Sequence, residues 1–535
     1  MDVSVNQTWD RKVHDREVHM KRKKLAASLL ALLMASTTIT ACGSSDSKAE
    51  PAAGGDSGEA VEVDTSIDME GEPYTVNFCY FVAQEGADQQ KVNEAVNELT
   101  MRELNMKVNM IPMTFGTYNN QIQLMLSSGE DLDVFPAFAN RMADYITSQY
   151  IVDLNDYESY LTGVKEVMGE EDYYAGTVAG FLTGFPRMQE RGYPAGLVVR
   201  KDIMDELGYS IEDFQGIRPG DWDSYQKVTD LFAAVHEAYP DMVVFDGGVS
   251  LGTSTYAWTD VLSDTFGVLE NYGQTTTVTN WFESEEFYQL AKLHRTWFEK
   301  GYESADIATN TDSGEIKMKA GNCFSFLLYY KPNTAAEKLS QTGYEVEVIE
   351  LSDACKMTTG VASAVYSIAN ASKDKTKAAQ FLNWAYTNGE FNDLLNWGIE
   401  GLDWVVDEDG NATYPEGITA ATCGYHNDFG WIYPNQFAGH AWTGNPSDIW
   451  DQYKEYNDSM LTSKAYGFQL DTTPIATEIA QLNTVWEQYQ KDVCFGILDP
   501  DTAIKEMNDA MYAAGLQTVI DEKQKQLDEW LAAQN

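Results

Sequence analysis

The chain has 535 residues, of which 44% are hydrophobic, and 83 acidic side chains against 36 basic ones give a formal net charge of −47. This excess of acid argues against binding to nucleic acid or adsorption onto anionic lipid, because both require basic patches. The length exceeds the ~250–300 residues at which single cores stop growing, so two or more lobes are expected.

Residues 20–41 have the pattern of a secretory signal peptide. Four consecutive cations at 21–24 precede an apolar run at 25–34, which is followed by small residues. The apolar run is shorter than the ~20 residues that span a bilayer. The sequence Ile39-Thr-Ala-Cys42 resembles a bacterial lipobox, in which cleavage before the cysteine leaves an N-terminal Cys that carries lipid. We therefore expect a lipoprotein anchored through Cys42 to the extracellular face of the bacterial cell membrane; a short buried helix is the alternative.

The segments on either side of this signal are polar. Residues 1–19 lack an apolar period and are expected to be a mis-assigned upstream extension, with Met20 as the start. Removing residues 1–41 takes away seven basic and four acidic side chains, which leaves a formal net charge of −50. Residues 42–72 are rich in Gly, Ser, Ala and acids and cannot bury enough apolar surface to become ordered. They are expected to be a disordered tether that spans on the order of 30 Å.

The cysteines do not form a recognisable framework. If Cys42 carries lipid, five remain, so at least one of them must be free. None has CxxC spacing, which argues against zinc and redox sites. We expect mostly buried thiols. The five are Cys79, Cys323, Cys355, Cys423 and Cys494.

Strands and helices alternate in the first part of the body. This alternation indicates βαβ units and a parallel sheet covered on both faces. Ligands of such sheets bind at the carboxyl ends of the strands. Gly129 follows a helical pattern and is the expected C-cap. The expected strands are 74–82, 107–112 and 132–135, and the expected helices are about 88–105 and 118–128.

The later part of the chain contains more helices. From about residue 473 it is expected to be almost entirely helical. The expected strands are 242–246, 323–330 and 344–349, and the expected helices are 284–300, 375–387, 501–514 and 516–533.

Short stretches distributed over more than 400 residues resemble the family 1 extracellular solute-binding proteins, the lipid-anchored receptors of ABC importers. Residues 127–135 carry the family's small-small-Gly and Asp-hydrophobic pattern, and residues 197–208 carry its strand, basic-Asp, helix and Gly pattern. The final stretch, 516–530, suggests a subgroup with an extended helical C-terminal domain. Residues 246–273 match no part of the pattern, and specificity is expected to be set there. Further matching stretches are 297–301, 316–321, 368–384 and 398–401.

The resemblance implies an α/β, two-lobed periplasmic-binding-protein-like (type II) fold with hinge strands and a helical C-terminal extension. Lobe I would comprise residues 73–195 plus 362–400, and lobe II residues 196–361 plus 401–535. The lobes of such a fold close on ligand about the hinge. The resemblance also implies a monomer that captures a small solute, an oligosaccharide, and delivers it to the permease subunits of an ABC transporter. It implies no catalysis, no cofactor, no metal and no contact with the membrane except through the lipid anchor.

A sugar site requires flat aromatic faces for stacking and carboxylates or amides for hydroxyl groups. The candidate ligand-binding residues lie at strand ends in both lobes and near the hinge. The chain contains 13 Trp, 30 Tyr and 22 Phe, so an aromatic residue falls near almost any chosen position. The candidates are Phe81, Gln84, Glu85, Asn140 and Arg141 in lobe I, Trp258, Tyr329 and Tyr330 in lobe II, and Trp397, Glu400 and Trp431 near the hinge.

Two alternatives to this function stay open. The stretch 248–252 fits the G-x-S-x-G nucleophile elbow, which would suit a surface-anchored polysaccharide or ester hydrolase. However, no helix pattern begins after Ser250 and no HGGG-like segment precedes it, which favours a Gly-rich loop beside the cleft. The second alternative is a receptor for a peptide or an amino-acid derivative.

Two features of the sequence bear on metal binding: an acidic stretch and the histidines. The acidic stretch 407–411 is typical of a hairpin turn between two β-like runs, with a structural calcium loop as the alternative. The four histidines after the signal peptide include no i, i+4 pair, so no zinc site is expected.

Overall fold

The computed structural model describes residues 64–82, 84–192, 194–246, 257–309, 312–420 and 422–534, except for the side chains of Asn140 and Thr359. The predicted signal peptide, the lipid attachment at Cys42 and the G-x-S-x-G stretch lie outside these residues. Within the described ranges, no helix combines the length and the apolar character that a membrane span requires.

The first lobe is built on a five-stranded sheet with the order β2-β1-β3-β12-β6. The first strand pairs in parallel with the second and the third, and α2 (Gln89–Leu104) and α3 (Phe115–Ser128) connect them. The predicted βαβ units and the C-cap at Gly129, with φ of 68°, are confirmed. The strands are β1 (Tyr74–Phe81), β2 (Met106–Met113), β3 (Val134–Phe138), β6 (Phe185–Pro186) and β12 (Ala364–Ile368).

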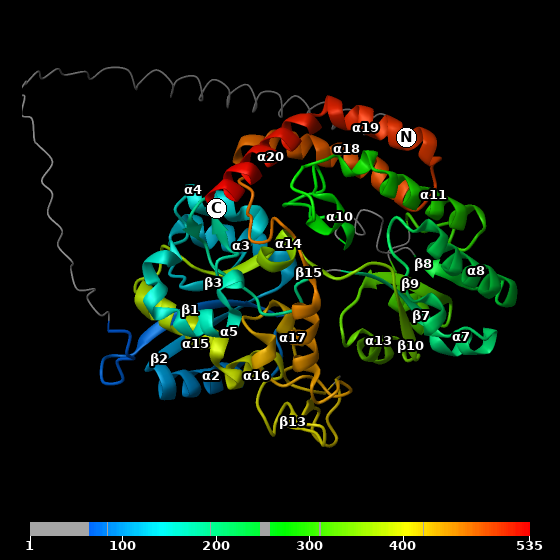
Figure 1. Cartoon of the computed structure of the whole chain (residues 1–535). Coiled ribbons are helices and arrows are strands. Elements are labelled where there is room, and N and C mark those ends of the chain that lie inside the picture. Colours follow the sequence, from blue (N-terminus) through cyan, green and yellow to red (C-terminus); the bar gives the residue numbers. More distant parts are fainter. Residues whose placement is uncertain are drawn as a thin grey trace, which may run out of the picture. The chain divides into compact units, whose positions relative to one another are not determined.

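Helix periodicity explains how this sheet is covered. Val92, Val96 and Leu99 of α2 lie three or four residues apart and are buried, so they share one face of the helix. That face packs against the sheet, and α15 (Lys375–Thr387) packs against it as well (Figure 1). The ring of Phe78 in the sheet lies 5.5 Å from that of Phe381 in α15, which places an aromatic core between the two.

The second lobe contains a four-stranded sheet with the order β10-β7-β9-β8. β9 pairs antiparallel with β7 and parallel with β8. Helix α11 (Glu285–Glu299) begins where the Ser284 side chain accepts a hydrogen bond from the Phe287 amide. The strands are β7 (Ala195–Arg200), β8 (Val243–Asp246), β9 (Cys323–Tyr329) and β10 (Val346–Glu350), and the other helices are α7 (Lys201–Leu207), α8 (Trp222–Ala238), α12 (Gly314–Lys319) and α13 (Thr334–Thr342).

The chain crosses between the two lobes at residues 187–194, 351–363 and 460–466. β11 (Cys355–Lys356) in the second crossing pairs in parallel with β15 (Leu461–Thr462) in the third. A Cβ atom at Gly192, in the first crossing, would lie 2.5 Å from the Cys355 carbonyl oxygen and 3.0 Å from the Met460 sulfur. Glycine therefore allows the three crossings to touch, and they form the hinge region of the two-lobed fold.

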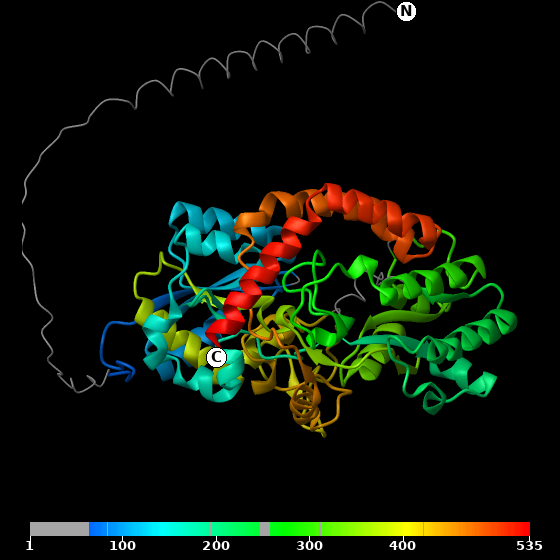
Figure 2. The same ribbon diagram turned by 45° about the horizontal axis from the view of Figure 1, so that its top comes forward.

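The C-terminal part is helical, as predicted, and consists of α18 (Ala476–Cys494), α19 (Pro500–Ala513) and α20 (Leu516–Ala533). These three helices contact one another (Figure 2). Buried apolar side chains from each, such as Trp486, Met507 and Leu527, belong to the core of the second lobe. The helices therefore complete the second lobe and do not form a separate body.

Two segments contribute to the first lobe from outside its predicted ranges. Its core includes four side chains from the stretch expected with lobe II, namely Tyr425, Ile432, Tyr433 and Tyr466. The end of the expected tether also lies against this lobe. Asn105 donates hydrogen bonds to the carbonyls of Asp68 and Gly71, and Gln380 donates to those of Thr65 and Ser66.

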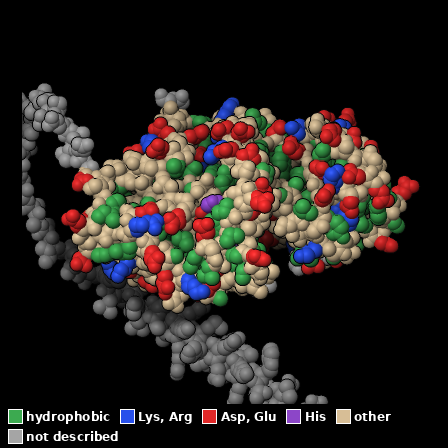
Figure 3. All heavy atoms as spheres, turned by 90° about the horizontal axis from the view of Figure 1, so that it is seen from below, with side chains coloured by type: hydrophobic (Ala, Val, Ile, Leu, Met, Phe, Trp, Pro, Cys, Tyr) green, Lys and Arg blue, Asp and Glu red, His purple; other side chains and the backbone are tan. Residues whose placement is uncertain are grey.

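The buried thiols and the hairpin turn at residues 407–411 match what was expected from the sequence. The five cysteines of the described part are free, and only Cys423 is not fully buried. β13 (Val405–Val406) and β14 (Ala412–Thr413) form the predicted hairpin, and Asp407 Oδ1 accepts from the amides of Asp409 and Asn411 at 2.9 Å each. Among the described residues, no group of three His, Cys, Asp or Glu side chains is arranged to hold a metal. Acidic side chains outnumber basic ones on the face shown in Figure 3.

Candidate ligand-binding pocket

A pocket of about 360 Å³ lies between α13 of the second lobe, the loop that follows residue 425, and α17 (Ile449–Ser459). Four tryptophans line it: Trp397, Trp431, Trp442 and Trp450. Its titratable lining side chains include Lys331, Glu337, Asp428 and His440. The pocket thus combines aromatic faces with charged groups.

Trp431 is held by a stack of three aromatic rings. Its ring lies 5.7 Å from that of Phe115 with an interplanar angle of 5°, and Phe115 in turn lies 4.1 Å from buried Phe81. Each offset pair of this kind contributes about 0.5–1.5 kcal/mol beyond burial. Trp431 is nevertheless 37% exposed and lines the pocket. The ring is therefore held by Phe115 while part of its surface remains exposed to the pocket.

A second aromatic cluster surrounds Trp397. The indole nitrogen of Trp397 donates to the His440 carbonyl at 3.0 Å, and its ring lies 4.8 Å from that of Trp442. The His426 ring is 4.5 Å from Trp442. Burial lowers the pKa of His426 to about 4, so this imidazole is neutral at pH 7 and acts as part of the aromatic wall.

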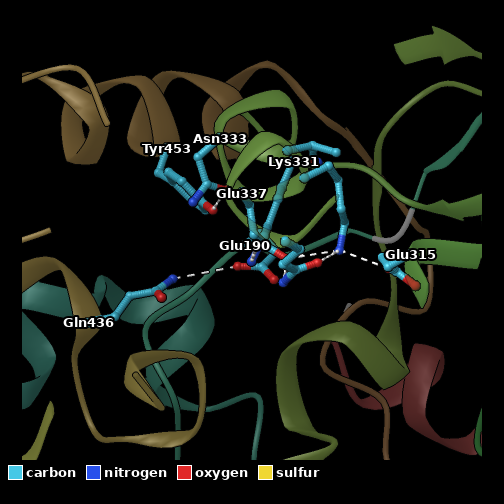
Figure 4. Close-up of polar contacts among 10 residues, drawn as sticks. Glu190, Glu315, Lys331, Asn333, Glu337, Gln436 and Tyr453 are labelled. Carbon is cyan, nitrogen blue, oxygen red and sulfur yellow. Dashed lines mark hydrogen bonds and ion pairs between the residues drawn. The ribbon is translucent and has the colours of Figure 1, made fainter. Parts of the chain in front are cut away.

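An ionic network of residues on α12, on α13 and just before α13 lies at the polar side of the pocket (Figure 4). Lys331 lies 3.3 Å from Glu337, and Lys338 lies 3.0 Å from both Glu337 and Glu315. Burial raises the pKa of Glu337, but the charges of Lys331 and Lys338 outweigh it, and the net pKa lies below the usual value. Burial likewise lowers the pKa of Lys331, but Glu190 and Glu337 outweigh it and the net pKa is raised. Both groups are therefore charged at neutral pH.

Polar contacts extend this side of the pocket toward the hinge and α17. The amide of Gln436 donates to Glu190, in the first crossing, at 3.5 Å. The Tyr453 hydroxyl of α17 donates to Asn333 Oδ1 at 2.8 Å, and Figure 4 shows these side chains beside the network. The polar wall is thus assembled from the second lobe, the hinge and α17.

Asp428 differs from the other charged residues of the pocket. It has a φ of 53°, in the left-handed region that Asn and Asp tolerate better than most residues. The residue is exposed in the pocket, and desolvation by the surrounding protein, followed by the charge of Glu337, raises its pKa to about 6 against the opposing charge of Lys331. No hydrogen bond from the described residues reaches its carboxylate.

His440 has a carboxylate partner. Its Nδ1 lies 2.7 Å from Asp393 Oδ2, and its backbone amide donates to Asp393 Oδ1 at 2.7 Å. The hydrogen bond with Asp393 raises the pKa of His440 above its usual value, against the opposing effect of burial.

The structure brings together three of the residues proposed from the sequence. Trp397 and Trp431 line the pocket, and Phe81 supports Trp431 from within the core. Glu85 and Gln84 are exposed, as is Glu400, and none of them lines the pocket.

The other proposed residues also lie outside the pocket lining. Arg141 donates to Gln123 and pairs with Asp144, while Trp258 is buried in the second core, 6.3 Å from Trp281. Tyr329 and Tyr330 are half-buried immediately before Lys331, and the side chain of Asn140 is not described.

Sequence reasoning missed Asp428, Trp442 and the ionic side of α13. Lys331 directly follows the proposed Tyr330, so its position just past the strand end was a usable signal. The Trp-rich composition of residues 425–450 was a second usable signal.

Two α/β lobes, joined by three crossings beside an aromatic pocket, define the class of two-lobed binding proteins. Residues 83–390, more than half of the chain, match the family model described as bacterial extracellular solute-binding protein. The chain belongs to this family, as its sequence resemblance implied. Residues 464–532 match a second model, a domain of unknown function (DUF3502), which corresponds to the C-terminal helices.

Known proteins share both sequence and fold with this chain. A carbohydrate ABC transporter substrate-binding protein of Streptococcus pneumoniae serotype 4 (strain ATCC BAA-334 / TIGR4) is 25% identical over 451 residues, which cover 81% of this chain and 87% of the relative. The N-glycan transport solute binding protein (NgtS) from Streptococcus pneumoniae has a TM-score of 0.74 at 20% identity, over 86% of this chain and 100% of that one. The alginate-binding protein AlgQ2 has a TM-score of 0.58 at 15% identity, over 86% and 99%. These structures establish the fold.

Proposed function

We propose that this protein is the receptor of a carbohydrate ABC importer, which captures an oligosaccharide and delivers it to the permease subunits. The observation that carries the proposal is the exposed Trp431 ring in the same pocket as the charged and polar side chains at α13. A sugar ring offers an apolar C–H face for stacking and hydroxyl groups for hydrogen bonds. The description of the S. pneumoniae relative as a carbohydrate transporter component supports the same ligand class.

The pocket position fits a receptor that closes on its ligand. Its lining comes from α13 on one side and from the Trp431 loop, whose neighbours Ile432 and Tyr433 belong to the first core, on the other. A ligand that contacts both sides favours the closed arrangement of the lobes. Closure would hide the sugar from water and present one lobe arrangement to the permease.

The proposed function also implies an oligomeric state and a cellular location. The protein would act as a monomer on the extracellular face of the bacterial cell membrane, held by lipid on Cys42, and would leave its ligand chemically unchanged. Contacts of Ser66 and Asp68 with the first lobe support a tether that ends at the fold. The alternatives are a surface-anchored polysaccharide or ester hydrolase and a peptide receptor.

A thermal-shift screen with neutral oligosaccharides, peptides and polyols separates these functions. A ligand at 100-fold its Kd stabilises the fold by ~2.7 kcal/mol, which corresponds to a midpoint shift of a few degrees. We expect a shift with oligosaccharides that are recovered intact by mass spectrometry. Cleavage of the added glycan would support the hydrolase, and shifts with peptides alone would support the peptide receptor.

A further inference from the structure

We infer that the pocket selects neutral sugars over acidic ones, and that Asp428 determines this specificity by accepting hydrogen bonds from sugar hydroxyls. This inference rests on the proposed function and adds the charge of the ligand and the residue that orients it.

The cations of the pocket are already paired. Lys331 lies 3.3 Å from Glu337 and is also influenced by the charge of Glu190. His440 lies 2.7 Å from Asp393. Each lining cation named above thus faces a carboxylate of the protein, while Asp428 has no such partner among the described residues. The pocket therefore has a surplus of acid.

This surplus discriminates between ligands by charge. A uronic acid would bring a further carboxylate into a site where its charge is desolvated and where no cation is left to pair with it. Burial of an unpaired charge is unfavourable, and like charges at close range repel. A neutral sugar brings only hydroxyl groups, which can donate to the carboxylates that are present.

Asp428 is placed to receive those hydroxyls. It lies three residues before Trp431 in the same loop, and both line the pocket. A ring stacked on Trp431 would therefore have its polar edge beside the carboxylate. An ionised carboxylate offers about four acceptor positions, and hydrogen bonds to it are about twice as strong as neutral ones.

The groups around Asp428 decide how binding depends on pH. Glu337 on α13 and Lys331 before it act on the carboxyl group directly, and Tyr453 of α17 and Tyr414 also interact with it electrostatically. His440 is a further titratable group of the lining, Glu190 acts on Lys331, His426 packs on Trp442 behind the lining, and Tyr433 interacts with Asp428 electrostatically.

Desolvation by the surrounding protein raises the pKa of Asp428 to about 6, so the carboxylate is ionised at pH 7 and mostly protonated at pH 5. The lowered pKa of Glu337 and the raised pKa of Lys331 keep both charged over this interval, and Asp428 is the lining carboxyl whose pKa falls within it. If only the ionised form binds tightly, affinity for a neutral sugar falls by roughly tenfold from pH 7 to pH 5.

Isothermal titration calorimetry on the full chain tests the inference with two disaccharides. The probes are mannosyl-N-acetylglucosamine and the same compound with its terminal hydroxymethyl group oxidised to a carboxylate, each at pH 7 and pH 5. We expect the neutral sugar to bind at least tenfold more tightly than the acid at pH 7, and to lose roughly tenfold at pH 5. Equal or tighter binding of the acid at pH 7 would overturn the charge selection.

Two variants separate a ligand contact from a structural role. Asp428→Asn keeps the shape and the tolerance for positive φ, and should bind the neutral sugar about tenfold more weakly at pH 7 with little dependence on pH. Glu337→Gln should free Lys331 and raise affinity for the acidic disaccharide severalfold while the neutral one changes less.

The outcomes distinguish this inference from the proposed function. An Asp428→Asn protein with wild-type affinity and the wild-type pH slope would overturn the role of Asp428. If wild type binds neither disaccharide nor any oligosaccharide of the thermal-shift panel, the proposed function fails and this inference fails with it. Circular dichroism of each variant confirms that it is folded.

Discussion

Lys523 in the C-terminal helices is buried and Asp428 in the pocket is exposed, and the described part of the chain supplies hydrogen-bond partners to Lys523 alone of the two. The Lys523 ammonium has four oxygens within 3.1 Å, from Val261, Asp264 and Gly267. Asp428 receives no hydrogen bond from the described residues. Buried polar groups are normally satisfied by the protein, as Lys523 is, whereas the exposed carboxylate of Asp428 is left to accept hydrogen bonds from water or from a ligand.

The comparison separates the roles of the two regions. Lys523 joins α20 to the stretch 261–267, and Asn508 of α19 donates to the Phe282 carbonyl at 3.0 Å. Internal satisfaction of this kind fixes residues 261–267 within the second lobe. In the pocket, the rings of Phe115 and Phe81 hold Trp431 from behind. The side chains that line the pocket remain available to a ligand.

The largest effect is expected from Lys523→Met. The substitution removes the charge while preserving most of the volume, so the Asp264 carboxylate and three backbone carbonyls lose a donor. Breaking a buried pair from one side costs about 3–5 kcal/mol. Urea denaturation should show this loss as a lower midpoint.

A matched substitution tests whether burial is the cause. Lys505→Met removes a lysine on α19 whose partner is Asp509, and both side chains are mostly exposed. It should leave the midpoint unchanged, because exposed i, i+4 pairs contribute little. Equal losses in both variants would contradict the role assigned to the Lys523 site.

Trp431→Ala should remove most of the stacking surface for a ligand. We expect oligosaccharide affinity to fall by ~2 kcal/mol, roughly 30-fold, and the free energy of unfolding to fall by about 1 kcal/mol because the stack on Phe115 is lost. Calorimetry measures the first quantity and thermal unfolding the second. Trp222→Ala is the control, since Trp222 packs on the second core outside the pocket; it should lower stability and leave affinity intact.

Phe115→Ala should have a smaller effect on the same ligand. It removes the ring behind Trp431 but no pocket surface, and an offset aromatic pair contributes about 1 kcal/mol, roughly fivefold in affinity. Leu124→Ala on the same helix is the control, because Leu124 is 67% exposed. A Phe115→Ala protein with undiminished affinity would show that Trp431 is oriented by other contacts.

The sequence predicted the elements whose patterns are local. The helices at 375–387 and 516–533 have the predicted bounds, and the first begins where the Asp374 side chain accepts from the Lys377 amide. β3 begins at Val134, two residues later than predicted. The reason is not local, because the Asp133 side chain accepts from the Asn77 amide and the Tyr74 hydroxyl of the neighbouring strand.

The pocket was less predictable because its loop is placed by distant contacts. The Tyr433 hydroxyl donates to the Phe81 carbonyl at 2.8 Å, and the Tyr425 hydroxyl donates to the Leu395 carbonyl at 3.1 Å. These bonds bring residues 425–433 to the first lobe, although no helical or strand period marks the stretch. Aromatic residues near strand ends therefore led to Phe81 and Trp431 but not to Asp428.

The smallest effect concerns the paired cation His440 and is visible in its pH dependence. Asp393 raises the pKa of His440 above 6.5 in the folded chain. The contribution of this pair to stability is therefore fully present below pH 6.5, the unfolded value, and is lost as pH rises through the folded pKa. Because the His440 side chain is 40% exposed, solvent screening limits this contribution to less than ~1 kcal/mol.

His440→Gln retains a donor for Asp393 but cannot titrate. The difference in unfolding free energy between wild type and this variant should be largest at pH 5–6 and should shrink above pH 7 and at high salt. Urea denaturation at several pH values measures it. A difference that grows with pH would mean that His440 is neutral in the fold, and Lys331 would then be the only one of the two cations that balances the acids of the pocket.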